Sequence, residues 1–203
     1  MNIGGASVTG AIAQSAVAAF LRKRMEDARD VLLDEFETAR IHRIEFTSQD
    51  ELGGVLFRYF NAIRDNAARL NMRLMAKVMV SQAHRGELFA DPFSQYAAAL
   101  ACLTRDEVIV LAALMEIWSD FVAKGGGSDR DIHRELNGKL VPTVFPTVKH
   151  VSAALASASK SGLLFRFESP FGNVGFYPSP LLEEVVLYAD FQDALRKEKV
   201  EDK

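Results

Sequence analysis

At 203 residues, 49% of them hydrophobic, the chain can bury a sizeable core in one large domain or two small ones. Its formal net charge of -3 argues against a protein that is basic overall, so any nucleic-acid binding must come from a local patch. The single cysteine, Cys102, cannot form an internal disulfide, which argues against a secreted, cross-linked scaffold and favours a cytoplasmic location.

The N-terminal region shows a helical pattern from about Val8 to Arg40. Apolar residues recur there at steps of three and four and form one stripe: Phe20 or Leu21, Met25, Ala28, Leu32 and Phe36. The charged residues of the opposite side, Asp34 among them, are expected to face solvent. We expect the stripe to pack on another helix of the same chain. Because its steps also approximate heptads, a helix from a second copy of the chain is the alternative.

The run from Ile3 to Leu21 is rich in alanine, contains polar residues, and is followed by its basic residues instead of being preceded by them. A signal peptide carries its positive charges before the apolar run, and a membrane span needs about 20 strongly apolar residues. We therefore predict no membrane span and interpret the run as a packing helix, with an interfacial membrane anchor as the alternative.

Ser48 and Glu51 have the spacing of a capping box, which predicts the start of a second long helix. Its apolar period continues almost to Gly86, so we predict one helix over this whole segment. Three cations of this helix are spaced four residues apart without an acid at the same spacing: Arg69, Arg73 and Lys77. This row predicts either a solvated face or a seat for phosphate or an acidic partner.

Asp91 and Pro92 predict the N-cap and first residue of a short helix that runs to about Ala101. We place a boundary near Leu103, which divides the chain into a helical region, residues 1–103, and a C-terminal module, residues 104–203. No Pro- or Gly-rich linker marks this boundary, so we expect the two halves to pack together.

The C-terminal module reads as three helices, a hairpin and a last helix. Thr104 and Glu107 form a second capping box and open a long, mostly apolar helix. A short helix capped by Ser128 and ending at Leu136 is expected next, followed by a loop or short strand over 140–145 and a third helix from Pro146 to Gly162. Two strands over 163–168 and 174–177, joined by the loop 169–173, should form the hairpin. A final helix is expected from Leu181 to about Lys197. The predicted fold class is mainly α, with a helical N-terminal region packed on an α+β module that has one β-hairpin.

The order helix, helix, helix, hairpin resembles the winged-helix superfamily over residues 104–178, especially in TVKHVSAALASASKSGLLFRF, where the third helix runs through Gly162 into a strand. The whole chain is also similar to uncharacterised bacterial or phage-borne proteins in which long helices precede such a module. The usual mode of the superfamily places the third helix in the major groove and the hairpin, or wing, on the DNA backbone. The resemblance implies these candidate contacts: Lys149, His150, Ser152, Ala153, Ser157, Lys160 and Arg166.

Charge supports this surface only in part. Residues 132–167 contain five basic residues, including Arg134 and Lys139, against Glu135 as the one acid. Over residues 104–178, however, eight basic residues are balanced by eight acidic ones. The connection between the second and third helices also runs about nine residues, against the three or four of a helix-turn-helix. A winged helix used for protein contact has the same features.

No catalytic, metal or cofactor motif stands out in the sequence. The histidines and Cys102 are scattered without the close pairs that zinc sites use, so we predict no metal and no cofactor. Glu183 and Glu184 are adjacent and point to different sides of their helix, and there is no serine-hydrolase elbow. We expect a non-enzymatic interaction or assembly module whose partner is another protein or a second copy of the chain. The alternative is a winged-helix DNA-binding regulator.

Overall fold

The computed structural model describes residues 6–40, 48–65, 67–125, 129–168 and 174–201, and these residues are mainly helical. The first half forms four helices: α1 (Ala6–Thr38), α2 (Gln49–Arg64), α3 (Arg69–Arg85) and α4 (Ala90–Ala101). The second half forms α5 (Arg105–Ala123), α6 (Asp129–Leu140), α7 (Val148–Ala158), a 3₁₀ turn (Ser159–Ser161), β1 (Leu164–Glu168), β2 (Val174–Pro178), α8 (Pro180–Tyr188) and α9 (Phe191–Glu201). The expected fold class, mainly α with one hairpin near the C-terminus, is confirmed.

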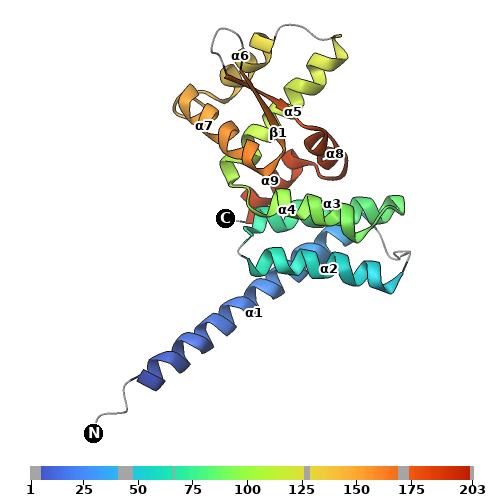
Figure 1. The fold of residues 1–203 in the computed structure, drawn as a ribbon, viewed down its shortest axis with the longest axis vertical. Coiled ribbons are helices and arrows are strands. Elements are labelled where there is room, and N and C mark those ends of the chain that lie inside the picture. The colour runs from blue at the N-terminus through green and yellow to red at the C-terminus, as the bar shows by residue number, and fades with distance from the viewer. Residues whose placement is uncertain (1–5, 41–47, 66, 126–128, 169–173, 202–203) are drawn as a thin grey trace.

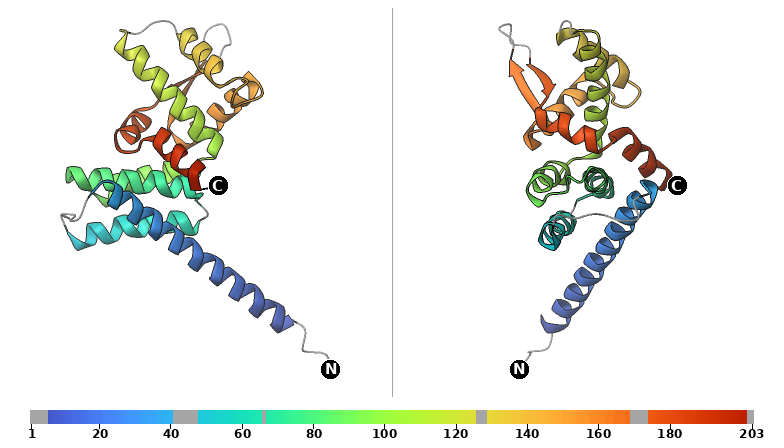
Figure 2. Two further views of the ribbon diagram at one scale, coloured as in Figure 1. Left: turned by 180° about the vertical axis from the view of Figure 1, so that it is seen from behind. Right: turned by 90° about the vertical axis from the view of Figure 1, so that its right-hand side faces the viewer.

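The helices are arranged in two packed groups and one projecting rod (Figure 1). Helices α2, α3 and α4 lie side by side in one group, and α5 to α9 with the hairpin form the other. The C-terminal part of α1 packs on α2 and α3, while its N-terminal part extends away from the body in all three views (Figure 2).

One continuous hydrophobic cluster joins the two groups. It extends from Ala28 on α1 to Leu195 on α9 and includes the buried faces of α3, α4 and α5. Helices α8 and α9 return from the end of the chain to pack on α3, and α9 also packs on α5. The last two helices therefore attach the second group to the first.

The hairpin is anchored to α6 and stiffened by a ring. Strands β1 and β2 pair antiparallel, with Arg166 opposite Phe176, and the backbone N–H of Phe176 donates to His133 Nε2 at 3.2 Å. The ring of Phe167 lies over Gly175, where any Cβ would come within 2.0 Å of a ring carbon. Only glycine fits this position. The two strands are confirmed, and the loop predicted over 169–173 lies outside the described residues.

The prediction of one helix from Ser48 to Gly86 is wrong, because α2 ends at Arg64 and α3 begins at Arg69. The N–H of Asp65 caps α2 by donating to Asn61 O at 3.0 Å, and Ala68 has extended backbone angles before α3. Both helices carry the same apolar period, so the pattern alone could not show the break. The Asp65-Asn66 pair, two residue types that favour helix ends and turns, was the available signal.

The prediction of a single final helix is also wrong, because α8 and α9 are separated at Ala189 and Asp190. Ala189 has extended angles, φ −124° and ψ 114°, and Asp190 Oδ1 accepts from the N–H of Asp193 at 2.9 Å. Asp190 thus starts a new helix by capping it. The change of direction lets buried Phe191 and Leu195 dock α9 on the body.

Two further helix boundaries, the end of α6 and the start of α7, differ from the expected ones. Helix α6 continues through Gly138 to Leu140, since Ile132, Leu136 and Leu140 recur at i, i+4 and i+8 and are all buried. The cap expected at Ser128 lies outside the described residues. Helix α7 begins at Val148 instead of Pro146.

Helix α4 begins at Ala90, two residues before the expected start at Pro92. Its first N–H donates to Glu51 Oε2 on α2 at 2.7 Å, so a distant carboxylate caps it in place of Asp91. At the start of α2, Ser48 Oγ accepts from the N–H of Glu51 at 3.1 Å, which confirms half of the predicted box. The other half is replaced by the link to α4.

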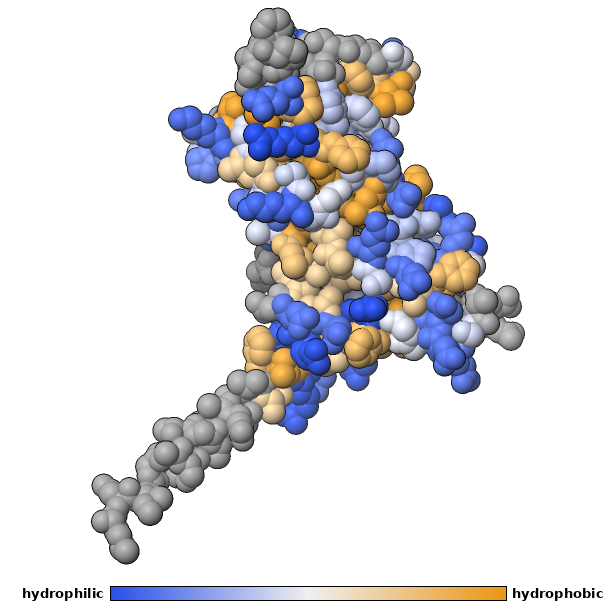
Figure 3. Space-filling model, viewed as in Figure 1, coloured by the Kyte–Doolittle hydropathy of each residue, from blue (hydrophilic) through white to orange (hydrophobic). Residues whose placement is uncertain are grey.

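The predicted apolar stripe of α1 is buried only in its C-terminal part. Ala28 and Leu32 are buried and Phe36 packs against the core, whereas Phe20 is 56% exposed and Met25 is exposed. The reason is that the N-terminal part of α1 extends away from the body. Figure 3 shows apolar surface at the point where the coloured part of α1 begins.

Candidate functional site

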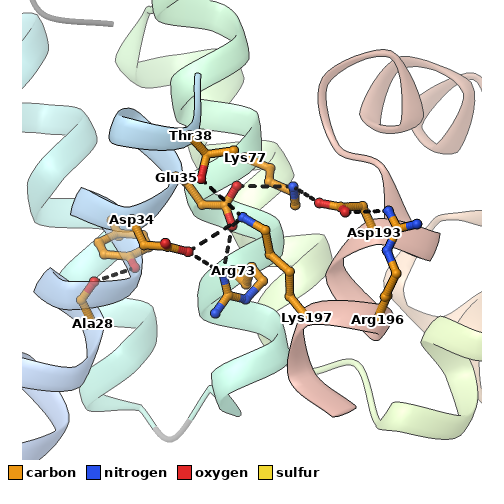
Figure 4. Close-up of polar contacts among 10 residues, drawn as sticks. Ala28, Asp34, Glu35, Thr38, Arg73, Lys77, Asp193, Arg196 and Lys197 are labelled. Atoms are coloured by element: carbon orange, nitrogen blue, oxygen red, sulfur yellow. Dashed lines mark hydrogen bonds and ion pairs between the residues drawn. The ribbon is translucent and has the colours of Figure 1, made fainter. Parts of the chain in front are cut away.

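Three helices far apart in the sequence meet at a cluster of charged side chains (Figure 4). We call it the ion cluster, and its members are Asp34 and Glu35 of α1, Arg73 and Lys77 of α3, and Asp193 and Lys197 of α9. Two of the cations belong to the row predicted from the sequence.

Arg73 lies at the centre of the ion cluster and is 1% exposed. Its Nη1 donates to Asp34 Oδ2 at 2.8 Å and to Glu35 Oε1 at 2.7 Å. A guanidinium in such a place needs carboxylates, because an unpaired buried charge is very costly. The expectation of a solvated face is therefore wrong for Arg73, and Asp34, expected to face only solvent, pairs with it across the helices.

Glu35 is 3% exposed and is contacted by three cations. Lys197 Nζ donates to Glu35 Oε1 at 2.9 Å, and Lys77 Nζ lies 3.0 Å from Glu35 Oε2. Lys77 also donates to Asp193 Oδ2 at 2.6 Å. The cluster therefore ties α1 to α3 and both of them to α9.

The cluster shifts the pKa of its three acids and of Lys77 in the direction that keeps each of these groups charged. Burial alone would raise the pKa of Glu35, but hydrogen bonds from Lys197, Arg73 and Lys77 outweigh it and hold the pKa below its usual range. Asp193 is affected in the same way: burial alone would raise its pKa, but hydrogen bonds from Lys77 and Arg196 together with the charges of Lys77 and Lys197 lower it to about 2. Burial opposes the charge of Lys77 as well, yet hydrogen bonds to Asp193 and Glu35 raise its pKa.

This arrangement is a structural clamp. Each carboxylate has cationic partners and none is poised as a free base, because its pKa is lowered where a general base needs a value near the working pH. A hollow of about 290 Å³ beside the cluster is lined by Ser81, His84 and Tyr188 among others. The acidic partner that the sequence row could have implied lies within the same chain.

Sequence reasoning missed Glu35, although a signal was present. Glu35 follows Ala28 by seven residues and Val31 by four, which places it on the buried face of α1. A carboxylate on a buried face requires a cationic partner from another helix. The cationic row on α3 was the partner that the sequence offered. Arg69, the first residue of the row, is exposed at the start of α3.

The predicted nucleic-acid surface on α7 is exposed. Lys149, His150, Ser152, Ala153 and Lys160 are all exposed, Ser157 is half-buried, and Arg166 is exposed on β1. The opposite face of α7 is buried through Val151, Leu155 and Ala158. The structure therefore brings these residues to the outside of the second group, as the pattern predicted.

The two candidates on α6 differ in their surroundings. Arg134 is exposed, whereas Lys139 Nζ lies 2.5 Å from Glu116 Oε1 on α5. Part of the positive charge counted for residues 132–167 is thus neutralised by an acid from outside that segment. The candidate cations on α7, the 3₁₀ turn after it and β1 are Lys149, Lys160 and Arg166.

The sequence also raised the questions of a metal site and of a paired role for Glu183 and Glu184. Among the described residues, no group of three or more His, Cys, Asp and Glu side chains is placed to hold a metal ion. Glu183 and Glu184 contact different helices: Trp118 Nε1 on α5 donates to Glu183 at 3.0 Å, and the hydroxyl of Tyr96 on α4 donates to Glu184 at 3.1 Å. The pair therefore links α8 to both α5 and α4.

None of the helices in the described part of the chain combines the length and the hydropathy that a membrane crossing requires. Comparisons of the chain with protein-family models, with curated proteins and with solved structures find no match.

Proposed function

We propose that this chain is a non-enzymatic assembly module that associates with a second copy of itself through the distal part of α1, defined as residues 6–21. The observation that carries the proposal is the contrast between the two ends of α1. Its C-terminal part is fixed to the body, and its distal part extends from it (Figure 1).

The fixed end of α1 makes the helix a rigid support. Ala28 and Val31 are buried, and the hydroxyl of Tyr59 donates to Ala28 O at 2.9 Å. Arg24 donates to Ala67 O in the connection between α2 and α3. Between Arg24 and Ala18 the side chains are exposed except for half-buried Leu21, and Phe20 is 56% exposed.

The composition of the distal part favours a protein partner. Residues 1–21 contain no Asp, Glu, Lys or Arg. A helix without charged residues gains little from facing water, and most helical stability in proteins comes from packing against another element. Burial of this segment in a partner would supply that packing.

A second copy is the partner that fits best. An uncharged segment meets the same segment of another chain without charge repulsion, and two-fold pairing of identical surfaces is the commonest form of assembly.

Sedimentation equilibrium tests the proposal. We expect the full chain to show a mass that rises with concentration above that of one chain. Ala18→Glu and Ala19→Glu place a charge on the exposed distal part and should weaken association at least about tenfold, because the charge would be buried at the contact. Ala153→Glu is the matched control, since it adds the same charge at an exposed alanine of α7. A single-chain mass at every concentration would contradict the proposal, as would equal weakening by the control.

A second candidate function, a winged-helix DNA-binding regulator, is favoured by the exposed face of α7. That face carries Lys149, the 3₁₀ turn that follows it carries Lys160, and α7 contains no Asp or Glu. Arg166 is exposed on the adjoining strand. Such a surface suits phosphate contacts, which dominate the affinity of DNA binding.

Fluorescence anisotropy with a labelled duplex tests this second candidate at about 50 and 200 mM salt. Binding through phosphate contacts should weaken steeply with salt, and the double variant Lys149→Glu, Lys160→Glu should abolish it. Arg58→Glu, an exposed charge reversal on α2, should leave it unchanged. No binding at the lower salt, or equal loss in the control, removes the DNA-binding function.

A further inference from the structure

A groove of about 810 Å³ lies between α5 and α9 and is bordered by the end of α6 and the turn that follows it. We call it the α5–α9 groove. The described residues that line it are Ile109, Ala113, Lys139, Leu140, Val144, Gln192, Leu195, Arg196 and Lys199. Its volume falls within the range of about 300–1,000 Å³ that is usual for small-molecule sites.

The floor of the groove is aliphatic. Ala113, Leu140 and Leu195 are buried beneath it, and Val144 is 46% exposed at its edge. Gln192 is the only uncharged polar side chain among the described residues that line it. A peptide would bring backbone N–H and C=O groups that need partners, and this lining offers few. A hydrocarbon chain needs none.

The charged residues of the groove are all cations. Lys139, Arg196 and Lys199 line it, and no acid does so among the described residues. Lys139 is paired with Glu116 and Arg196 with Asp193, while Lys199 has no ion-pair partner in the described part of the chain. Lys199 and Arg196, three residues apart on α9, are therefore placed to share an incoming anion.

We propose that the α5–α9 groove binds a medium-chain fatty-acid anion, with its hydrocarbon chain on the aliphatic floor and its carboxylate at Arg196 and Lys199. Both halves of this ligand match the lining: apolar area is removed from water along the floor, and the negative charge meets an excess of cations. The site does not involve the distal part of α1, so it stands apart from the proposed self-association.

Calorimetric titration of the full chain with dodecanoate, kept below its micelle concentration, tests the proposal. We expect saturable binding of one dodecanoate per chain. Decanoate should bind up to about 16-fold more weakly, because each methylene buried contributes up to about fourfold in affinity. Dodecyltrimethylammonium, with the same chain and the opposite charge, should not bind measurably.

Two variants locate the site. Arg196→Gln with Lys199→Gln should weaken dodecanoate binding by about fivefold to tenfold, the range for two exposed ion pairs, and Val144→Asp should weaken it as well. Lys149→Gln on α7 with Lys160→Gln on the 3₁₀ turn after it is the matched control and should have no effect.

Three results would overturn the site: no binding of dodecanoate, equal binding of the cationic detergent, or equal weakening by the control pair. An acidic peptide that displaces dodecanoate and binds more tightly would also overturn it, by assigning the groove to a protein partner. Ala18→Glu should leave dodecanoate binding unchanged, so failure of this proposal is separable from failure of self-association.

Discussion

Arg73 is a charged side chain that the fold surrounds almost completely, and its environment explains why α1 is held at a fixed angle. The guanidinium keeps its charge because Glu35 and Asp34 approach it from α1. Breaking a buried ion pair by removing one partner usually costs about 3–5 kcal/mol, since the remaining charge is left without compensation. At the residue scale, Glu35 is the side chain on which the attachment of α1 depends.

Glu35→Gln should lower the free energy of unfolding by about 3 kcal/mol, because it removes the buried carboxylate that pairs with the buried guanidinium of Arg73. Urea denaturation followed by circular dichroism measures the change. Asp30→Asn is the control on the same helix: it breaks an ion pair with Arg29 that is 61% and 62% exposed, and its effect should stay below about 0.5 kcal/mol. Equal effects of the two variants would contradict the clamp.

The ion cluster also predicts how stability depends on pH. Asp193 has a pKa of about 2 in the folded chain, below its ordinary value of about 3.9, so its contribution is present above pH 4 and is lost as the pH falls toward 2. Lys77 has a raised pKa, so its contribution is full below its ordinary value of about 10.4 and is lost as the pH rises through the higher folded value. The urea midpoint should therefore fall on the acid side between about pH 4 and 2.

Asp193→Asn provides the check on this pH dependence. The variant should be less stable at pH 7 and should show a shallower loss of stability between about pH 4 and 2, because one carboxylate with a lowered pKa has been removed. An unchanged slope in the urea midpoint would mean that Asp193 is not held by Lys77.

At the scale of the element, helix ends in the first group are held by side chains from other helices. Glu51 caps the start of α4, and Asn71 Nδ2 on α3 donates to Ala101 O and Leu103 O at 2.8 Å each, where α4 ends. These links replace local caps, because α4 has no side-chain cap of its own. They set the spacing between helices as well as their ends.

The approach of α4 to α2 makes two neighbouring glycines behave differently. A Cβ on Gly54 would come within 2.9 Å of Ala90 Cβ, whereas a Cβ on Gly53 meets nothing within 4 Å. Gly53→Ala should stabilise the chain by about 0.5–1 kcal/mol through helix propensity alone. Gly54→Ala has the same propensity gain but should be net destabilising by about 1 kcal/mol or more, because α2 and α4 must move apart. Thermal unfolding of the two variants tests this, and equal stabilisation by both would show that the helices are not in close contact.

Elements whose signals are local could be predicted from the sequence, and those that depend on distant partners could not. Thr104 and Glu107 form both bonds of their predicted capping box because the two residues lie in one turn. The start of α4 was misplaced because its cap, Glu51, lies 39 residues away. The end of α6 was misplaced because burial of Leu140 outweighs the helix penalty of Gly138.

The same distinction applies to the candidate surfaces. The exposed residues of α7 followed from its own periodicity, since Val151, Leu155 and Ala158 face inward and leave Lys149 and Lys160 outside. The burial and ion pairing of Arg73 could not be predicted from the spacing of the cations on α3, because the acids that pair with it come from α1. The α5–α9 groove could not be predicted at all, since its lining comes from three helices whose relative positions only the fold defines.

At the scale of the whole molecule, the body acts as a base from which α1 projects. Helix α9 closes this base, because Asp193 and Lys197 connect the end of the chain to α3 and α1. The C-terminal part of α1 and the two helix groups therefore form one packed unit. The hydrophobic cluster that runs through both groups also joins them. Figure 2 shows the distal part of α1 extending away from the second group, so self-association through it would join two such units away from α7 and α9.

Amide hydrogen exchange over residues 6–21, measured by mass spectrometry at protein concentrations from about 0.1 to 100 μM, tests the central claim most directly. If a second copy covers the distal part of α1, exchange there should be slow at the highest concentration and should accelerate on dilution, while residues 28–36 stay protected throughout. Fast exchange over residues 6–21 that is the same at every concentration would contradict self-association through α1.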